Sequence, residues 1–222
     1  KCFQPYHIAM IASGASKCSV RIVDSVFTEE FIRQIQAKAN CKLFQPQHIA
    51  MIASGASKSS GIQVESVFTG DFKGQIQANL RCFKPLELAM IANAASKSSG
   101  IQVESVFTEV FIARIQANLR DFKPQHLSMI ANAVARTVFL DEGLRRDLDS
   151  ALFGCVGACL DSEAGAAFNA QDIGLLSRWV KKSSLSDGCQ SELNNKLNGL
   201  LEIITFDVES GLYHIIRFLL LL

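Results

Sequence analysis

The chain has 222 residues, of which 49% are hydrophobic, with only four prolines and a formal net charge of +1. This length suffices for one sizeable domain, and the apolar content excludes a disordered chain. A charge so near zero gives no strong global field that would draw the protein to nucleic acid or to a membrane surface.

One segment recurs along the chain and decides the expected fold class. Its copies begin at five positions: Phe3, Phe44, Phe83, Phe122 and Phe168. The middle copies start 39 residues apart, and self-similarity at a period of about 20–50 residues is typical of stacked repeats. We therefore expect an all-α protein. Residues 1–185 would form a right-handed α-solenoid of about five stacked helical hairpins, and residues 186–222 would form terminal capping helices.

The first helix of each hairpin shows the same local signals, which the second copy illustrates. Pro46 stands where proline is tolerated, in the first turn of a helix. His48 follows near the third helical position, where other copies have Glu87 or Asp172. This exchange of His with acids predicts hydrogen bonding in the first turn, or attraction of the acids to the helix dipole, and disfavours a metal site.

The buried face of this helix is expected at an i, i+3, i+4, i+7 spacing. In the second copy its members are Ile49, Ile52, Ala53 and Ala56. Gly14 and Gly55 lie in the same helices and cost about 1 kcal/mol each relative to alanine. We expect them to allow close packing between neighbouring helices.

The second helix of the hairpin is expected to begin near Ser66 or Thr69, after a linker that starts at Ser59. Apolar residues then recur every four positions, at Phe68, Phe72, Ile76 and Leu80. Aromatic side chains at this spacing indicate a helix core and not a cofactor site. Because one hairpin cannot bury this face alone, stacking of several hairpins is required.

The last part of the chain departs from the repeat. The fourth copy is longer, and its second helix is expected to bury Leu148, Leu152, Cys155 and Cys159. After Gly188 the pattern predicts a closing pair of helices. The final residues 215–222 are very apolar but too short to span a bilayer, which needs about 20 apolar residues. This tail would either pack under the end of the stack or dock on a partner.

Seven cysteines, an odd number, show no C-x-x-C spacing. We expect small buried hydrophobes in a reducing compartment in preference to metal ligands or disulfides. The chain begins at a lysine, so we also expect its native N-terminus, with any targeting peptide, to be missing.

Opposite the buried face of the first helices, stacking would align two rows of side chains. The first row is cationic in every copy: Lys17, Lys58, Lys97, Arg136 and Lys182. The second row is short and polar in four copies: Ser13, Ser54, Asn93 and Asn132. This layout is expected of a solenoid that follows single-stranded RNA, with cations on phosphates and polar groups near bases. The structural alternative is that a cation near a helix C-terminus is favourable by about 0.3–1 kcal/mol and that duplication copied it.

No catalytic constellation accompanies these rows. The sequence has no Gly-rich phosphate loop, no G-x-S-x-G and no H-E-x-x-H motif. We therefore expect no enzyme, no cofactor and no metal site.

The run FKPQHLSMIANAVAR at residues 122–136, preceded by FIARIQANLRD, resembles the helical-hairpin repeats of octotricopeptide and heptatricopeptide proteins, close to those of RAP-domain proteins. The likeness covers residues 3–136 well and 168–182 weakly, and no RAP domain is visible. That family often has tryptophan where this chain has the short polar row. The Met-Ile-Ala-Asn-Ala variant is nearer to the heptatricopeptide side.

The resemblance implies an organellar RNA-binding protein, a structural or assembly component of a ribonucleoprotein such as the mitochondrial ribosome. Its partners would be single-stranded or ribosomal RNA and neighbouring proteins, in the mitochondrion or alternatively the plastid. A second hypothesis is a protein–protein scaffold subunit of an organellar membrane or respiratory complex. The near-neutral charge and the apolar tail favour that hypothesis.

Overall fold

The structure, a computed structural model, describes residues 3–59, 62–97, 106–137, 141–162 and 167–219, with only the backbone course given beyond residue 204. Across these residues the chain is helical and contains no strand, which confirms the predicted all-α class. The helices are α1 (Pro5–Ala15), α2 (Val20–Val26), α3 (Glu29–Asn40), α4 (Pro46–Ala56), α5 (Ile62–Val67), α6 (Gly70–Ala78), η1 (Leu80–Cys82), α7 (Pro85–Ala95), α8 (Glu109–Ala117), η3 (Leu119–Asp121), α9 (Pro124–Arg136), α10 (Glu142–Leu160), α11 (Ala170–Lys182) and α12 (Asp187–Leu219).

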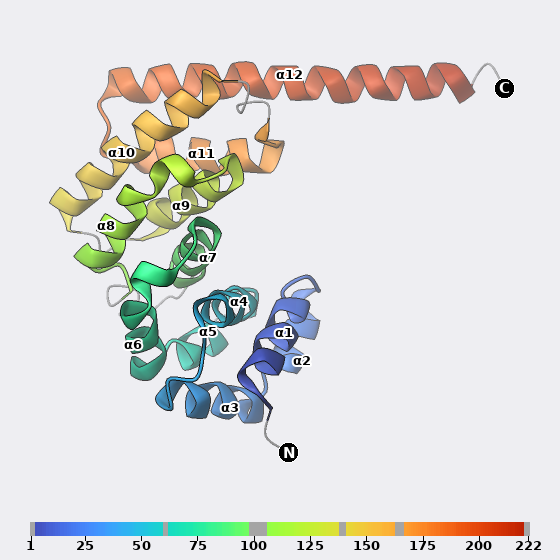
Figure 1. Ribbon diagram of the computed structural model, residues 1–222. Coiled ribbons are helices and arrows are strands. Elements are labelled where there is room, and N and C mark those ends of the chain that lie inside the picture. The colour runs from blue at the N-terminus through green and yellow to red at the C-terminus, as the bar shows by residue number, and fades with distance from the viewer. Residues whose placement is uncertain (1–2, 60–61, 98–105, 138–140, 163–166, 220–222) are drawn as a thin grey trace.

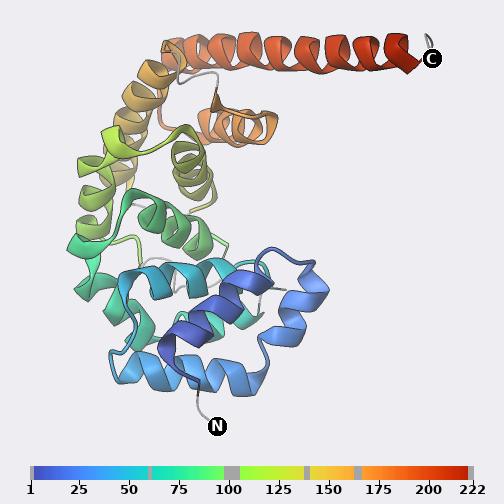
Figure 2. The ribbon, with the colours of Figure 1, turned by 45° about the vertical axis from the view of Figure 1, so that its right-hand side comes forward.

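The first helices of the five copies form one layer. Helices α1, α4, α7, α9 and α11 pack side by side in chain order, each against the next. They line one side of a curved body, and α3, α6, α8 and α10 line the other side (Figures 1 and 2). In that second layer α3 packs against α6, and α10 packs against α8. The hydrophobic core lies between the two layers.

The first turns of the first-layer helices are built as predicted. Proline opens α1, α4, α7 and α9. The backbone N–H of Gln45 donates to Nδ1 of His48 at 3.4 Å, and that of Lys84 donates to Glu87 at 2.9 Å. His126 and Asp172 accept the equivalent bonds in the fourth and fifth copies. Burial lowers the pKa of His48 and of His126, which favours the neutral ring that can accept at Nδ1.

The expected linkers are partly helical, which the sequence pattern missed. Short helices α2 and α5 lie between the two long helices of the first and second copies. The long second helices begin where a threonine caps them. Thr28, Thr69 and Thr108 each accept from the backbone N–H three residues on, at 3.3–3.4 Å.

The predicted core faces are buried, with one correction in the fourth copy. The second-copy residues from Ile49 to Ala56 and from Phe68 to Leu80 at the expected spacings are all buried. In α10, Leu148 and Leu152 are buried as expected, but Cys155 and Cys159 are only half-buried and Val156 completes the ladder. These two thiols lie beside the core. The other described cysteines are not buried either, since Cys189 is half-buried and Cys18, Cys41 and Cys82 are exposed, so the expectation of small buried hydrophobes is wrong for them.

A single helix, α12, replaces the expected closing pair. Its first half packs on α10 and α11 and buries Leu193 and Leu197, and its second half extends beyond the body (Figure 1). Of the described helices, α12 included, none combines the length and the apolar character needed to cross a membrane. Residues 220–222 of the apolar tail lie outside the described residues.

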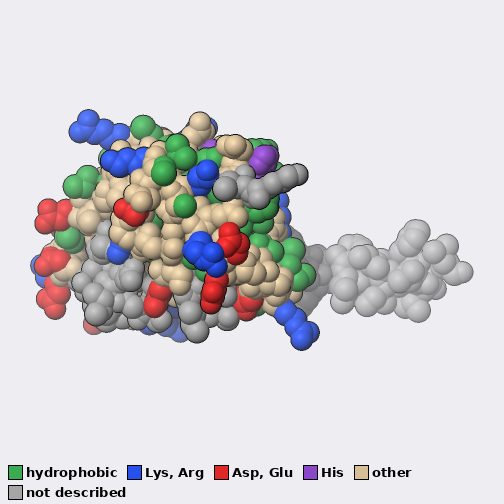
Figure 3. Space-filling model, turned by 90° about the horizontal axis from the view of Figure 1, so that it is seen from below, with side chains coloured by type: hydrophobic (Ala, Val, Ile, Leu, Met, Phe, Trp, Pro, Cys, Tyr) green, Lys and Arg blue, Asp and Glu red, His purple; other side chains and the backbone are tan. Residues whose placement is uncertain are grey.

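At the other end of the first layer, one flank of α1 is uncovered. Phe3 is 41% exposed, whereas its equivalents are at most 6% exposed; those are Phe44, Phe83, Phe122 and Phe168. Tyr6 and Met10 of α1 are also exposed. Figure 3 views the molecule from this end and shows hydrophobic side chains at the surface among polar ones.

Of the two glycines that were expected to allow close packing, only Gly55 has a neighbouring helix against it. A Cβ atom at Gly55 would lie 2.6 Å from the carbonyl oxygen of Ala12, so α4 approaches the backbone of α1 too closely for any side chain. A Cβ atom at Gly14 would meet nothing within 4 Å. The packing explanation therefore holds for Gly55 and is wrong for Gly14, which lies on the uncovered flank.

These glycines make a matched pair for a stability test. Gly55→Ala should lower the free energy of unfolding by about 1–2 kcal/mol, because the overpacking cost exceeds the gain in helix propensity. Gly14→Ala should raise it by about 0.5–1 kcal/mol through propensity alone. Urea unfolding followed by circular dichroism measures both. Equal effects of the two substitutions would contradict the close approach of α1 and α4.

Candidate functional site

The five cations of the first row stand at the C-terminal ends of the first-layer helices. Lys17, Lys58 and Lys97 lie two residues past the ends of α1, α4 and α7. Arg136 and Lys182 are the last residues of α9 and α11. Because these helices pack side by side, their ends place the cations in one row, which we call the cation column.

The structure brings the three central members of the cation column together at Lys97. Its side chain is half-buried, and its Nζ lies 3.5 Å from Oγ of Ser57. Burial and then the positive charges of Lys58 and Arg136 lower the pKa of Lys97 from 10.5 to about 8. Within the described part of the chain none of these three cations forms an ion pair. Their positive charge is therefore available to an anion.

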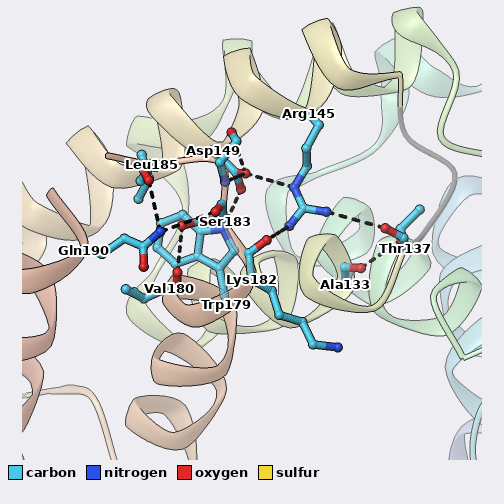
Figure 4. A network of polar contacts seen from close by, with 11 residues as sticks. Ala133, Thr137, Arg145, Asp149, Trp179, Val180, Lys182, Ser183, Leu185 and Gln190 are labelled. Carbon is cyan, nitrogen blue, oxygen red and sulfur yellow. Dashed lines mark hydrogen bonds and ion pairs between the residues drawn. The ribbon is translucent and has the colours of Figure 1, made fainter. Parts of the chain in front are cut away.

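Apart from Lys97, every member of the column has an exposed side chain. Lys17 and Lys182 are exposed at its two ends. The backbone carbonyl of Lys182 accepts from Nη2 of Arg145 at 2.9 Å, so the chain is fixed there while the side chain points away (Figure 4).

The second, polar row is aligned but largely bonded to itself. Nδ2 of Asn132 donates to Oδ1 of Asn93 at 3.0 Å, and Nη1 of Arg178 donates to Oδ1 of Asn132 at 3.4 Å. Asn132 is only 5% exposed, so it must give up these bonds before it can contact a ligand. Ser13 and Ser54 are half-buried, and their backbone carbonyls accept from the serines three residues on. Arg178 occupies the same repeat position in the fifth copy, so these side chains join α7, α9 and α11.

A buried network around Asp149 holds the end of the column. The carboxylate of Asp149 is fully buried and accepts from Nε1 of Trp179 at 2.7 Å and from Nε of Arg145 at 2.9 Å (Figure 4). The backbone N–H of Ser184 donates to it at 2.8 Å. Arg145 also donates to the carbonyl of Thr137, which follows Arg136, and to the carbonyl of Lys182, which ends α11. Every partner is structural, so the network positions helix ends and offers no open acid for chemistry.

A third row on the first helices was missed. All four methionines of the chain fall at one repeat position: Met10, Met51, Met90 and Met129. Met10 is exposed, and the others are half-buried against the core. The signal was in the sequence, because methionine occurs nowhere else, and it adds an adaptable apolar strip beside the cation column.

Among the described residues, no group of three or more His, Cys, Asp and Glu side chains is arranged to hold a metal ion.

Neither of two comparisons identifies a relative: no protein-family model matches the chain, and no curated protein matches it.

The confinement of Lys97 predicts a pH dependence. Half of the Lys97 side chains should be deprotonated near pH 8, because a lowered pKa favours the neutral amine. Lys58→Met and Arg136→Met should each raise this pKa. Neither substitution should restore the pKa of Lys97 to 10.5, since burial is the larger cause of its lowering. NMR titration of the lysine Nζ resonances measures the shift, with Lys182→Met as the control that leaves it unchanged. A Lys97 pKa unaffected by both substitutions would mean that the three cations are not neighbours.

Asp149→Asn should lower the free energy of unfolding by about 3 kcal/mol, because it leaves the Arg145 charge without its buried partner. Trp179, the only tryptophan, reports the change through its fluorescence. Asp147→Asn, on an exposed position of the same helix, is the matched control and should stay within about 0.5 kcal/mol of the unaltered protein. A fluorescence spectrum and a stability equal to the control would contradict a supporting role for Asp149.

Proposed function

We propose that the chain is a right-handed α-solenoid of about five helical hairpins that binds single-stranded RNA along the cation column. The observation that carries the proposal is the clustering of Lys58, Lys97 and Arg136. Three cations held together without a described acidic partner repel one another, and a phosphate chain would relieve that repulsion.

The packing order supports the solenoid reading. Each first-layer helix contacts the next, and equivalent residues meet across neighbours, as Asn93, Asn132 and Arg178 do at steps of 39 and 46 residues. A repeated spacing of this kind suits a polymer with one charge per unit.

The contacts with RNA would differ from the simplest expectation. Because Asn132 and Asn93 bond each other, the polar row is not free to read bases in the last three copies. The cation column would hold phosphates, and the half-buried methionines and exposed Gln47 and Gln125 would face the bases. Binding would then depend more on backbone charge than on sequence.

By its resemblance to octotricopeptide and heptatricopeptide repeats, such a protein would work in the mitochondrion, or alternatively the plastid. Its role there would be a structural or assembly component of a ribonucleoprotein such as the mitochondrial ribosome. This placement rests on the resemblance alone. Purification of the native protein with its associated RNA tests it directly.

One observation favours the second candidate, a protein–protein scaffold in an organellar membrane or respiratory complex. Tyr6, Met10 and Leu86 are exposed on the first-layer helices. Exposed apolar side chains of this size suit a protein partner better than a phosphate chain.

Salt dependence separates the two candidates. For single-stranded RNA the log–log slope of affinity against salt is about −0.7 per neutralised phosphate. Replacing Lys58, Lys97 and Arg136 by alanine should make the slope shallower by about 2 and weaken binding at low salt. Fluorescence anisotropy with a labelled oligouridine measures it.

The matched control removes three cations from the second layer and its connections, at Lys38, Lys42 and Arg81. It should change the slope less, since these positions lie outside the column. No binding by the unaltered protein at low salt, or equal slopes for the two triple variants, would reject RNA binding by the cation column.

A further inference from the structure

On the second layer a cavity of about 810 Å³ lies between α10 and the segment that joins α8 to α9. Its walls come from Leu119 to Leu127 on one side and from Ser150 to Cys159 on the other. This volume is within the range of small-molecule sites, about 300–1,000 Å³. The cavity reaches the N-terminal part of α9 at Pro124 and Leu127, whereas Arg136 of the cation column ends the same helix.

The repeats explain why the cavity exists. An equivalent but smaller cavity of about 310 Å³ lies between α6 and the segment that joins α3 to α4. The α10 residues that line the large cavity are each 80 positions beyond the α6 residues that line the small one, so Cys155 corresponds to Gln75.

In the earlier copies a long side chain bridges this gap. Nε2 of Gln75 donates to the carbonyl of Ala39 at 2.9 Å. Arg114 stands at the corresponding place in α8 and donates to the carbonyls of Leu80 and Arg81 at 3.2 and 3.1 Å. The thiol of Cys155 is too short to make such a bridge, so the space stays open.

The lining has a distinct chemistry. Leu119, Phe122 and Leu127 are buried side chains that give it an apolar floor. Burial raises the pKa of the Cys155 and Cys159 thiols, which are therefore neutral near pH 7.

The charged side chains among the described lining residues are all positive. Arg120 and Lys123 are exposed side chains of the lining, and none of the lining residues that the structure describes is acidic. The charge of Arg120 acts on the thiol of Cys155, which places the guanidinium near the α10 wall. An apolar floor with a cationic rim matches a ligand that has an apolar body and an anionic head.

We propose that the cavity between α10 and the α8–α9 segment binds a free medium-chain carboxylate, with its head group at Arg120 and Lys123. The alkyl chain lies along Leu119, Phe122 and Leu127 and faces the α10 wall that holds the two thiols. The site is independent of RNA binding, because none of its lining residues belongs to the cation column.

Decanoate is the probe, and isothermal titration calorimetry should show saturable binding with one site per chain. Decanol, which has the same chain without the charge, should bind at least tenfold more weakly. Arg120→Gln with Lys123→Gln should remove most of this difference. Equal affinity for decanoate and decanol in the unaltered protein would overturn the proposal.

Two substitutions close the cavity in different ways. Cys155→Arg restores the bridge that Arg114 makes in the preceding copy, and Gly154→Leu fills open space with a better helix former. Each should weaken decanoate binding at least tenfold, and Cys41→Arg, at an exposed cysteine elsewhere, should leave it unchanged. Decanoate binding retained in Gly154→Leu would overturn the proposal even if Cys155→Arg fails to fold.

Thiol labelling gives a second readout. Saturating decanoate should slow the reaction of Cys155 and Cys159 with a maleimide at least threefold, and it should leave the exposed Cys41 and Cys82 unaffected. Equal protection of all four cysteines would indicate adsorption of detergent-like probe to the surface and would count against the site.

Discussion

Close contact between small side chains holds the first-layer helices at the spacing on which the other features depend. Gly55 lies against the backbone of Ala12, and alanines such as Ala53 and Ala92 are fully buried in the same layer. A short separation of the helices lets Asn132 reach Asn93 and brings Lys58 near Lys97. Larger side chains at these contacts would separate both rows at once.

The two layers carry different surfaces because they are packed differently. The first-layer helices contact one another in an unbroken row, so equivalent side chains align and equal charges accumulate. The second layer is joined through side chains such as Gln75 and Arg114, which reach across to backbone carbonyls. Where a cysteine replaces the bridging side chain, that layer opens into a cavity.

Much of the local structure could be predicted from the sequence. The repeat period, the helix-opening prolines and the spacing of Ile49, Ile52 and Ala53 predicted helices and their buried faces, because these signals act within a few turns. First-turn bonding by His48 was likewise predicted from its exchange with acids in other copies.

The remaining features depend on contacts between segments that are distant in sequence. Nothing in the local pattern distinguishes Gly14 from Gly55, since only the neighbour of each helix decides whether a side chain fits. The same is true of Cys155, which has helical spacing suited to the core but points beside it. The hydrogen bonds among Asn93, Asn132 and Arg178 could not be predicted, because they depend on the distances between α7, α9 and α11.

Within residues 3–219 the exposed flank of α1 makes the two ends of the first layer unequal in stability. In a row where each unit is stabilised by its neighbours, the unit with one neighbour opens most easily. Helix α11 has α9 on one side and α12 on the other, and the Asp149 network anchors it, whereas α1 has only α4 beside it in its layer. For a chain of these residues, local unfolding should therefore begin at α1 and proceed along the layer. Lys17 would leave the column first, while the cluster around Lys97 stays assembled.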